Sequence, residues 1–298
     1  MPGMPQLVIA SEQRARPVSN WSRGLRRFVA NRRAVVGAVT LFLIVSCTVL
    51  APVVVPYDPN AVDLANMLQP PGPAHIFGTD NVGRDYLART LHGGRVSVAV
   101  GSIAMLISIG LGMLVGGTAG YFGGVVDEVL SRFVDFVLSL PIFFIMLVVV
   151  MLWQPTILNV ILLIGLSSWM PVARLVRAVL MAEREKDYVT AAVAAGAGVP
   201  RTMLHHLIPN IIGPVIVSAT FNVGDAILLE SALSFLGLGV QPPQATWGNM
   251  VIGAQQYLYN APWIAIFPGL MIVLTVMSFS FVGDGLRDAF DTQMLERW

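Results

Sequence analysis

The chain has 298 residues, of which 55% are hydrophobic and only 12% charged, and its mean hydropathy is +0.73. Soluble domains carry about 25% charged residues, so this composition excludes an ordinary soluble protein. The net charge of +1 gives no reason to expect a nucleic-acid partner, and the single cysteine, Cys47, excludes a disulfide framework.

The chain begins with a basic tail over residues 1–33, followed by the first long apolar run. This run begins too late for a cleaved signal peptide, is too long for its apolar region and lacks a clear small-x-small cleavage site. We therefore expect a retained cytoplasmic flank, with seven arginines at positions 14, 16, 23, 26, 27, 32 and 33.

Long uncharged blocks predict six membrane-spanning helices. A helix needs about 20 apolar residues to cross the ~30 Å hydrocarbon core, and backbone groups in lipid must be hydrogen-bonded within the segment. Residues 136–173 are uncharged over a length sufficient for two spans. The sequence therefore predicts an all-α integral membrane protein with spans at residues 34–55, 96–120, 130–153, 156–177, 211–237 and 263–283.

The basic residues predict the orientation of these spans. If both termini are cytoplasmic, fifteen of the 18 lysines and arginines lie inside, and only Arg84, Arg89 and Arg95 lie outside. This bias follows the positive-inside rule. We therefore expect cytoplasmic termini, including the tail 286–298, and a cytoplasmic link between the fourth and fifth spans.

Residues 56–95 form the expected outer segment, ahead of a five-span core over residues 96–285. The segment begins with a proline-rich stretch, and from Asp85 it shows a short amphipathic pattern. An amphipathic helix at this place is typical of a segment lying in the membrane interface. A simple surface connector is the alternative.

The second span carries glycines four residues apart, at positions 112, 116, 120 and 124. Small residues at this spacing allow another helix to approach closely. We expect packing within this chain, and a subunit contact is the alternative.

The cytoplasmic link, residues 181–210, is the most informative segment. Asp187 can cap a helix that runs through Ala191 and Ala192, and glycines at positions 196 and 198 are expected to end it. Pro200 suits the first turn of a second helix, and Pro209 is expected to mark that helix's end. The result is a helix–turn–helix elbow with small side chains, suited to a groove on another protein.

The run Thr190-Ala191-Ala192-x3-Gly196, with Pro209 thirteen residues after the glycine, resembles the "EAA" loop of ABC importer permeases. That pattern is Glu-Ala-Ala-x3-Gly-x9-Ile-x-Leu-Pro. This chain departs from it at Thr190, which stands where the family has Glu, and at His206 and Ile208. The missing carboxylate removes any ion pair at position 190, whereas the small-residue elbow is kept.

Three further blocks, within residues 77–250, resemble the dipeptide/oligopeptide permease "C" subunit of the peptide/nickel importers. They are FGTDNVGRDYLARTLHGGRVSV, GYFGGVVDEVLSRFVDFVLSLP and LLESALSFLGLGVQPPQATWGNM. The resemblance implies a type I ABC importer permease fold in a bacterial inner membrane. It also implies a second homologous permease, two cytoplasmic ATPases that bind ATP and magnesium, and an extracytoplasmic substrate-binding protein.

Two acidic residues, Asp225 and Glu230, interrupt the fifth span. A charged group at membrane depth costs at least ~2.5 kcal/mol and usually marks a pathway or a paired site. For Glu230 both readings stand, and we expect it to matter for transport more than for folding. Asp225 is expected to be a satisfied structural carboxylate. Trp247 and Gly248 belong to an expected outer loop near the binding protein.

The sequence offers no catalytic motif. A P-loop requires GxxxxGK[ST], and the only lysine is Lys186, between Glu185 and Asp187. We therefore expect no enzyme activity, no metal and no cofactor in this chain. A nickel importer permease is the alternative of the same class. An intramembrane enzyme is the alternative of another class, although Asp225 and Glu230, five residues apart, need not share a helix face.

Overall fold

The computed structural model describes residues 20–154 and 156–290. The basic tail at residues 1–19 and the last eight residues, which include Arg14, Arg16 and Arg297, lie outside this range. Within it the chain forms helices joined by loops, and the only strand-like pairing is an isolated bridge between Thr79 and Asp85. The all-α prediction is confirmed.

Within residues 20–154 and 156–290, five helical segments are long and apolar enough to cross a membrane, and the number is six if a bent pair of helices is counted as one span. The five are α2 (Arg32–Val49), α4 (Tyr86–Phe122), α7 with α8 (Ile157–Ser167 and Trp169–Arg184), α10 with α11 (Val199–Arg201 and Ile208–Phe235), and α13 (Trp263–Phe290). The shorter helices include α1 (Asn20–Ala30), α3 (Ala51–Val54), α9 (Asp187–Ala194) and α12 (Trp247–Ala254), and two 3-10 turns lie at Leu64–Asn66 and Gln255–Tyr257.

The third predicted span differs from a single helix. It consists of α5 (Gly124–Ser139) and α6 (Ile142–Leu152), which meet at an angle of 78°. The break falls at Leu140, whose backbone is extended. Leu140 precedes Pro141, and the proline ring disfavours the helical conformation in the residue before it. This local clash explains why the predicted third span is a broken helix.

The predicted interfacial helix is also corrected. It is the start of α4, which runs for 37 residues without interruption. The Asp85 side chain caps it by accepting a 2.7 Å hydrogen bond from the Ala88 amide. Tyr86, Arg89 and Thr90 are buried, so this turn packs inside the protein as part of α4 and is not a separate helix.

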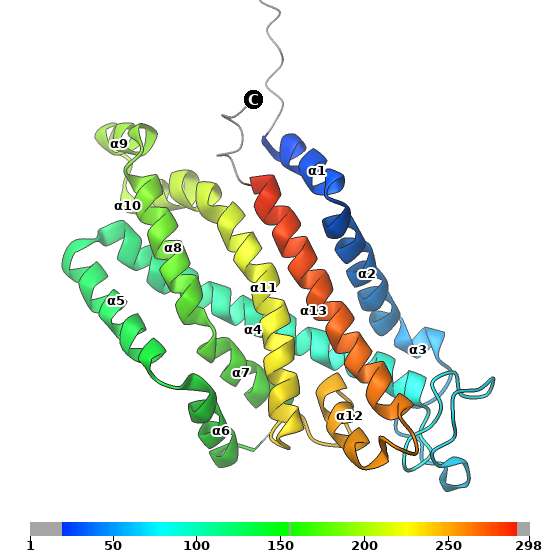
Figure 1. The fold of residues 1–298 in the computed structure, drawn as a ribbon. Helices are drawn as coiled ribbons and strands as arrows, with labels where there is room; N and C mark the ends of the chain where they lie inside the picture. Colours follow the sequence, from blue (N-terminus) through cyan, green and yellow to red (C-terminus); the bar gives the residue numbers. More distant parts are fainter. Residues whose placement is uncertain (1–19, 155, 291–298) are drawn as a thin grey trace, which may run out of the picture.

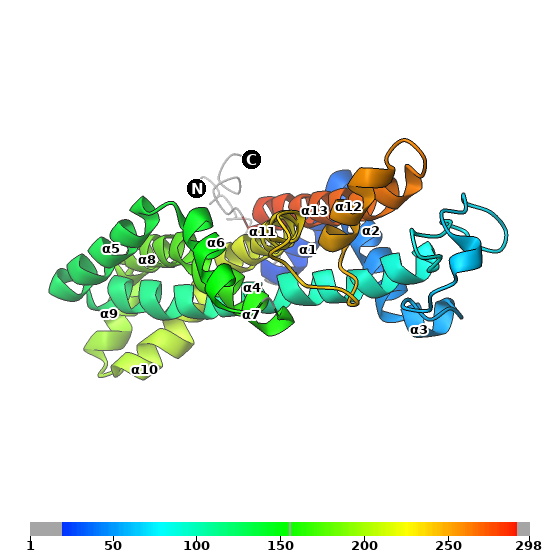
Figure 2. The ribbon, with the colours of Figure 1, turned by 90° about the horizontal axis from the view of Figure 1, so that it is seen from below.

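The helices form an elongated bundle with different structures at its two ends (Figure 1). α9, α1 and the C-terminal end of α13 lie at one end, and the outer segment and α12 lie at the other. Seen from below, α4 runs along one side of the molecule, and α11 and α13 run along the other (Figure 2).

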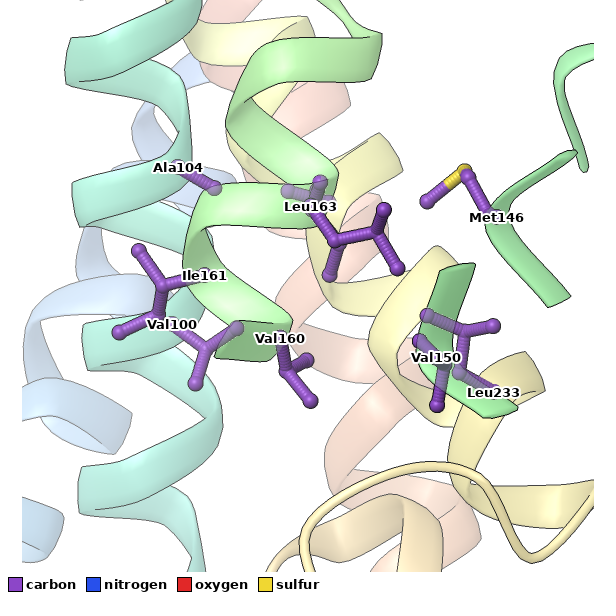
Figure 3. Packing of buried hydrophobic residues seen from close by; sticks show 10 residues of the cluster. Val100, Ala104, Met146, Val150, Val160, Ile161, Leu163 and Leu233 are labelled. Carbon is purple, nitrogen blue, oxygen red and sulfur yellow. The ribbon is translucent and has the colours of Figure 1, made fainter. Parts of the chain in front are cut away.

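A cluster of aliphatic side chains from four of these helices forms the centre of the core. Val100 and Ala104 on α4 pack against Ile161 and Ile164 on α7, and Leu233 on α11 joins them. Met146 and Val150 bring α6 onto the same cluster (Figure 3). This cluster therefore joins α4, α6, α7 and α11.

The glycine ladder brings α4 against α8, as expected for packing within the chain. A Cβ at Gly116 would lie 2.3 Å from the carbonyl oxygen of Ala173, and one at Gly112 would lie 2.5 Å from Val172. The two backbones can approach this closely only because the side chains are absent. Gly124 takes no part, since its Cβ would meet nothing within 4 Å and it begins α5.

Candidate functional site

The elbow between α8 and α11 has nearly the predicted form. α9 ends at Ala194, and Gly196 follows with φ of +88° in the left-handed region. Gly198 then caps α10, in which Pro200 occupies the first turn. The prediction for Asp187 is corrected: Lys186 is the N-cap, and Asp187 lies in the first turn with no side-chain cap bond. Its charge still lies where a helix N-terminus favours an anion.

The sequence predicts that the second helix of the elbow ends at Pro209, and this prediction is wrong. A π-helical turn, Thr202–Leu207, leads directly into α11, and Pro209 lies in the first turn of that helix. In this turn the amide of Ile208 bonds to the carbonyl of Met203, five residues earlier. A wider turn accommodates a residue that lacks an N–H, so the proline starts the span instead of ending the link.

The outer surface of the elbow is open. Thr190, Ala191 and Gly196 are exposed and Ala192 is half-buried. A Cβ at Gly196 would meet nothing within 4 Å. The tip therefore presents backbone and small side chains, which leave room for a close-fitting partner.

The base of the elbow is fixed to the spans on both sides of it. The Tyr188 hydroxyl donates to Oε1 of Glu183 on α8 at 2.5 Å and accepts from Nδ2 of Asn210 on α11 at 3.0 Å. Val189 and Leu207 are buried with side chains of α8 and α11. Burial, followed by the bond to Glu183, raises the pKa of Tyr188 to about 12, so its hydroxyl remains a donor at neutral pH.

Glu230 on α11 is completely buried. Its Oε1 accepts a 2.8 Å hydrogen bond from Ser234, and Oε2 has no partner among the described residues. The carboxylate therefore lies inside the protein, away from any surface that a passing molecule could touch. This position favours the structural alternative for Glu230.

Asp225, on the same helix, has the opposite surroundings. It is exposed and has no hydrogen-bond or ion-pair partner among the described residues. Ser218 and Asn222 lie seven and three residues before it, on the same helix face, and Nδ2 of Asn222 donates to the Ser218 carbonyl at 3.1 Å. Ser218, Asn222 and Asp225 thus form a polar face of α11, which the sequence positions of Asp225 and Glu230 alone did not indicate.

This polar face borders α4 at Asn222, whose Oδ1 accepts a 3.4 Å hydrogen bond from Ser108. Val223 and Ile227 contact α4 at Gly101, and Asp225 lies on the exposed side of the helix. Because an uncovered carboxylate in hydrocarbon is costly, the face that carries Asp225 is suited to water or to another subunit rather than to lipid.

The structure corrects the placement of Trp247 and Gly248. Trp247 is completely buried at the start of α12. Its indole Nε1 donates to the Thr90 carbonyl at 2.9 Å, and its amide donates to the Ser97 hydroxyl at 3.1 Å. A Cβ at Gly248 would lie 2.7 Å from Ser231. Both residues hold α12 against α4 and α11, so neither lies on a surface that a binding protein could contact.

Sequence reasoning missed the layer that the outer segment forms with the helix ends. Asp80 pairs with Arg84 at 2.6 Å, and Nη1 of Arg89 donates to the Pro59 carbonyl at 3.0 Å. The Tyr86 hydroxyl donates to the Ile264 carbonyl at 2.6 Å. The sequence signal was Asp80 four residues before Arg84, although such spacing does not by itself reveal contacts far along the chain.

Comparisons with known proteins agree with this geometry. Residues 108–296 match the family described as "Binding-protein-dependent transport system inner membrane component", and residues 19–71 match "N-terminal TM domain of oligopeptide transport permease C".

Three curated relatives are similar along nearly their whole length. The dipeptide transport system permease protein DppC of Haemophilus influenzae is 38% identical over 273 residues, covering 90% of this chain and 92% of the relative. The di/tripeptide transport system permease protein DppC of Pseudomonas aeruginosa is 40% identical and covers 90% of each chain. The oligopeptide transport system permease protein OppC of Haemophilus influenzae is 38% identical, covering 92% of this chain and 88% of the relative.

Proposed function

Because this chain belongs to the family of binding-protein-dependent transport system inner membrane components, we propose that it is a permease subunit of an ATP-driven importer of di- and oligopeptides. The relatives named as dipeptide, di/tripeptide and oligopeptide permeases support this cargo. The observation that carries the proposal is the exposed small-residue elbow, fixed to α8 and α11 and placed at the end of the bundle opposite the outer segment.

The energy comes from other subunits. The sequence contains no phosphate-cradling P-loop, so two cytoplasmic ATPases bind ATP and magnesium and dock at the elbow. A second homologous permease completes the pathway, and an extracytoplasmic binding protein delivers the peptide. This chain then performs no catalysis and holds no cofactor.

The chain lies in a bacterial inner membrane with both termini and the elbow in the cytoplasm. α1, the end of α13 and α9 lie at the same end of the bundle (Figure 1), and the basic residues follow the positive-inside rule in this orientation. The outer segment and α12 then face the binding protein.

The pathway runs along the polar face of α11 that carries Ser218, Asn222 and Asp225. A peptide backbone and its charged ends need hydrogen-bonding groups and water on their way through the membrane. The polar face supplies hydrogen-bonding groups, and Glu230 is too deeply buried to contribute directly.

Uptake in a strain deleted for this chain tests the cargo. Radiolabelled dipeptide and radiolabelled nickel are supplied separately, with and without a plasmid-borne copy. Restored dipeptide uptake with unchanged nickel uptake is expected. If only nickel uptake were restored, the nickel alternative would replace the peptide proposal. If neither uptake were restored, the transport proposal would fail for both cargoes.

A further inference from the structure

One side of α4 carries a row of exposed apolar residues over four turns. Ile103, Leu106 and Leu114 are 44%, 63% and 67% exposed, and Ala99 and Gly110 lie on the same face. The residues of α4 that contact α8 and α11, such as Gly101 and Gly116, lie on the opposite face. Towards its C-terminal end this face borders α8 and the start of α11, because Gly110 and Leu114 line one pocket with Val176 and Ile211.

A cavity of about 490 Å³ lies where this apolar face meets the outer segment. α4 contributes His92 and Arg95, and the wall is completed by Pro59 and Asn60 of the outer segment, Ile157 of α7 and Gln244 of the loop before α12. Arg95 lies one helical turn before Ala99, at the end of the apolar face. The cavity therefore continues the apolar face into a polar compartment.

The polar groups of this cavity are suited to an anion. Among the described residues, the guanidinium of Arg95 has no hydrogen-bond or ion-pair partner. His92 donates from Nδ1 to the Ala88 carbonyl at 3.0 Å, because a carbonyl only accepts, and Nε2 of the neutral ring is then an acceptor. The donors of the cavity are therefore Arg95 and the carboxamides of Asn60 and Gln244. The cavity lining contains no acidic residue to neutralise Arg95. An unpaired guanidinium beside two carboxamides is a typical setting for a phosphate or a carboxylate.

We propose that this cavity binds the phosphate of a membrane phospholipid whose acyl chains lie along the apolar face of α4. The face extends from Ala99 to Leu114 over about 22 Å at 1.5 Å per residue. That length exceeds one leaflet, roughly half of the ~30 Å hydrocarbon core. A peptide carboxylate shares the charge of a phosphate, but the adjoining apolar face matches a lipid chain rather than a peptide. The proposal rests on the spans and does not depend on the cargo.

Native mass spectrometry of the purified transporter in mild detergent tests the phosphate contact. The probes are dioleoyl phosphatidylglycerol, dioleoylglycerol without a phosphate, and glycerol 3-phosphate without acyl chains. Phosphatidylglycerol should bind most tightly. Arg95→Gln should weaken its binding about tenfold, since a charge-assisted hydrogen bond is lost, whereas Arg95→Lys should retain most of it. Arg201→Gln, at the elbow, is the matched charge control.

Several outcomes would overturn the proposal. Equal phosphatidylglycerol binding by the wild type and Arg95→Gln would place the lipid elsewhere. If Arg95→Gln weakened the binding of dioleoylglycerol as much as that of phosphatidylglycerol, Arg95 would have a structural role and would not bind the phosphate. Displacement of phosphatidylglycerol by a dipeptide would assign the cavity to cargo.

A second measurement tests the acyl chains independently of Arg95. A bimane fluorophore is attached at Leu106→Cys or at Ser218→Cys on a Cys47→Ser background, and the transporter is reconstituted with brominated phosphatidylglycerol. Quenching at position 106 with little at position 218 is expected. If bimane at position 106 were not quenched, another subunit would cover this face and the proposal would fail.

Discussion

The hydroxyl of Tyr188 donates a 2.5 Å hydrogen bond to Oε1 of Glu183, and Asn210 donates to the same hydroxyl from α11. One side chain therefore joins the first helix of the elbow to the spans before and after it. Glu183 is itself buried and also pairs with Lys186 at 2.7 Å. A force applied at the elbow would reach α8 and α11 together through this contact.

Tyr188→Phe should therefore impair coupling more than assembly. The variant keeps the ring and loses the bond to Glu183, a change worth about 1 kcal/mol. Peptide uptake by the reconstituted transporter should fall several-fold while the ATPases still co-purify, and ATP hydrolysis should depend less on cargo. Tyr121→Phe is the control, since its hydroxyl has no hydrogen-bond partner among the described residues. Equal effects of the two substitutions would argue against the coupling role.

A bulky side chain at the elbow should prevent ATPase docking. Ala192→Trp fills the space that the small residues leave, and Gly196→Val also strains a backbone with φ of +88°, which β-branched residues resist. Both variants should lose uptake and ATPase co-purification at normal membrane abundance. Tyr259→Trp, at a fully exposed position in the loop between α12 and α13, should co-purify with the ATPases as the wild type does. Normal co-purification with Ala192→Trp would mean that the elbow is only a connector.

The two carboxylates of α11 should respond differently to neutralisation. Asp225→Asn should lower uptake at normal abundance, because it removes a charge from the exposed polar face. Glu230→Gln should mainly reduce the melting temperature, since it places a new amide in a completely buried site whose Oε2 has no partner. Uptake and thermal unfolding in detergent are measured for both. Normal uptake by Asp225→Asn with impaired uptake by a stably folded Glu230→Gln would restore the pathway reading of Glu230.

The contact of α4 with α8 predicts unequal effects of two chemically identical substitutions. Gly116→Ala would bring a Cβ to 2.3 Å from the Ala173 carbonyl oxygen, so the helices must separate, at a cost of about 2 kcal/mol. Gly110→Ala meets nothing within 4 Å and should raise helix stability by up to ~1 kcal/mol. Thermal unfolding of both variants checks this. Equal stabilities would contradict the close packing.

The proposed orientation is tested with a cysteine at position 190 on the Cys47→Ser background. A membrane-impermeant maleimide should leave this cysteine unlabelled in intact cells and label it in inverted vesicles. A cysteine at the fully exposed Tyr259 should show the reverse. Labelling of position 190 from outside intact cells would invert the topology.

The spans could be predicted from composition because lipid imposes a minimum apolar length on any crossing helix. The elbow could also be predicted, since Gly196, Gly198 and Pro200 each limit the backbone locally. The continuation of the helix through Pro209 could not be predicted, because a π-helical turn accommodates the missing N–H of the proline. The position of this helix is fixed by its neighbours. The burial of Trp247 depends on Thr90 and Ser97, about 150 residues earlier in the chain. No local pattern contains such a contact.

The uninterrupted course of α4 has a mechanical consequence. At 1.5 Å per residue its 37 residues extend about 55 Å, well beyond the ~30 Å hydrocarbon core. Its first turns lie within the outer layer, and near its last turn Arg184 of α8 donates to the Tyr121 carbonyl at 2.5 Å. A tilt of about 5° about one end would move the other by about 5 Å, close to one helical turn. α4 can therefore act as a stiff strut, along which the arrival of a binding protein on one side of the membrane reaches the helix that carries the elbow on the other.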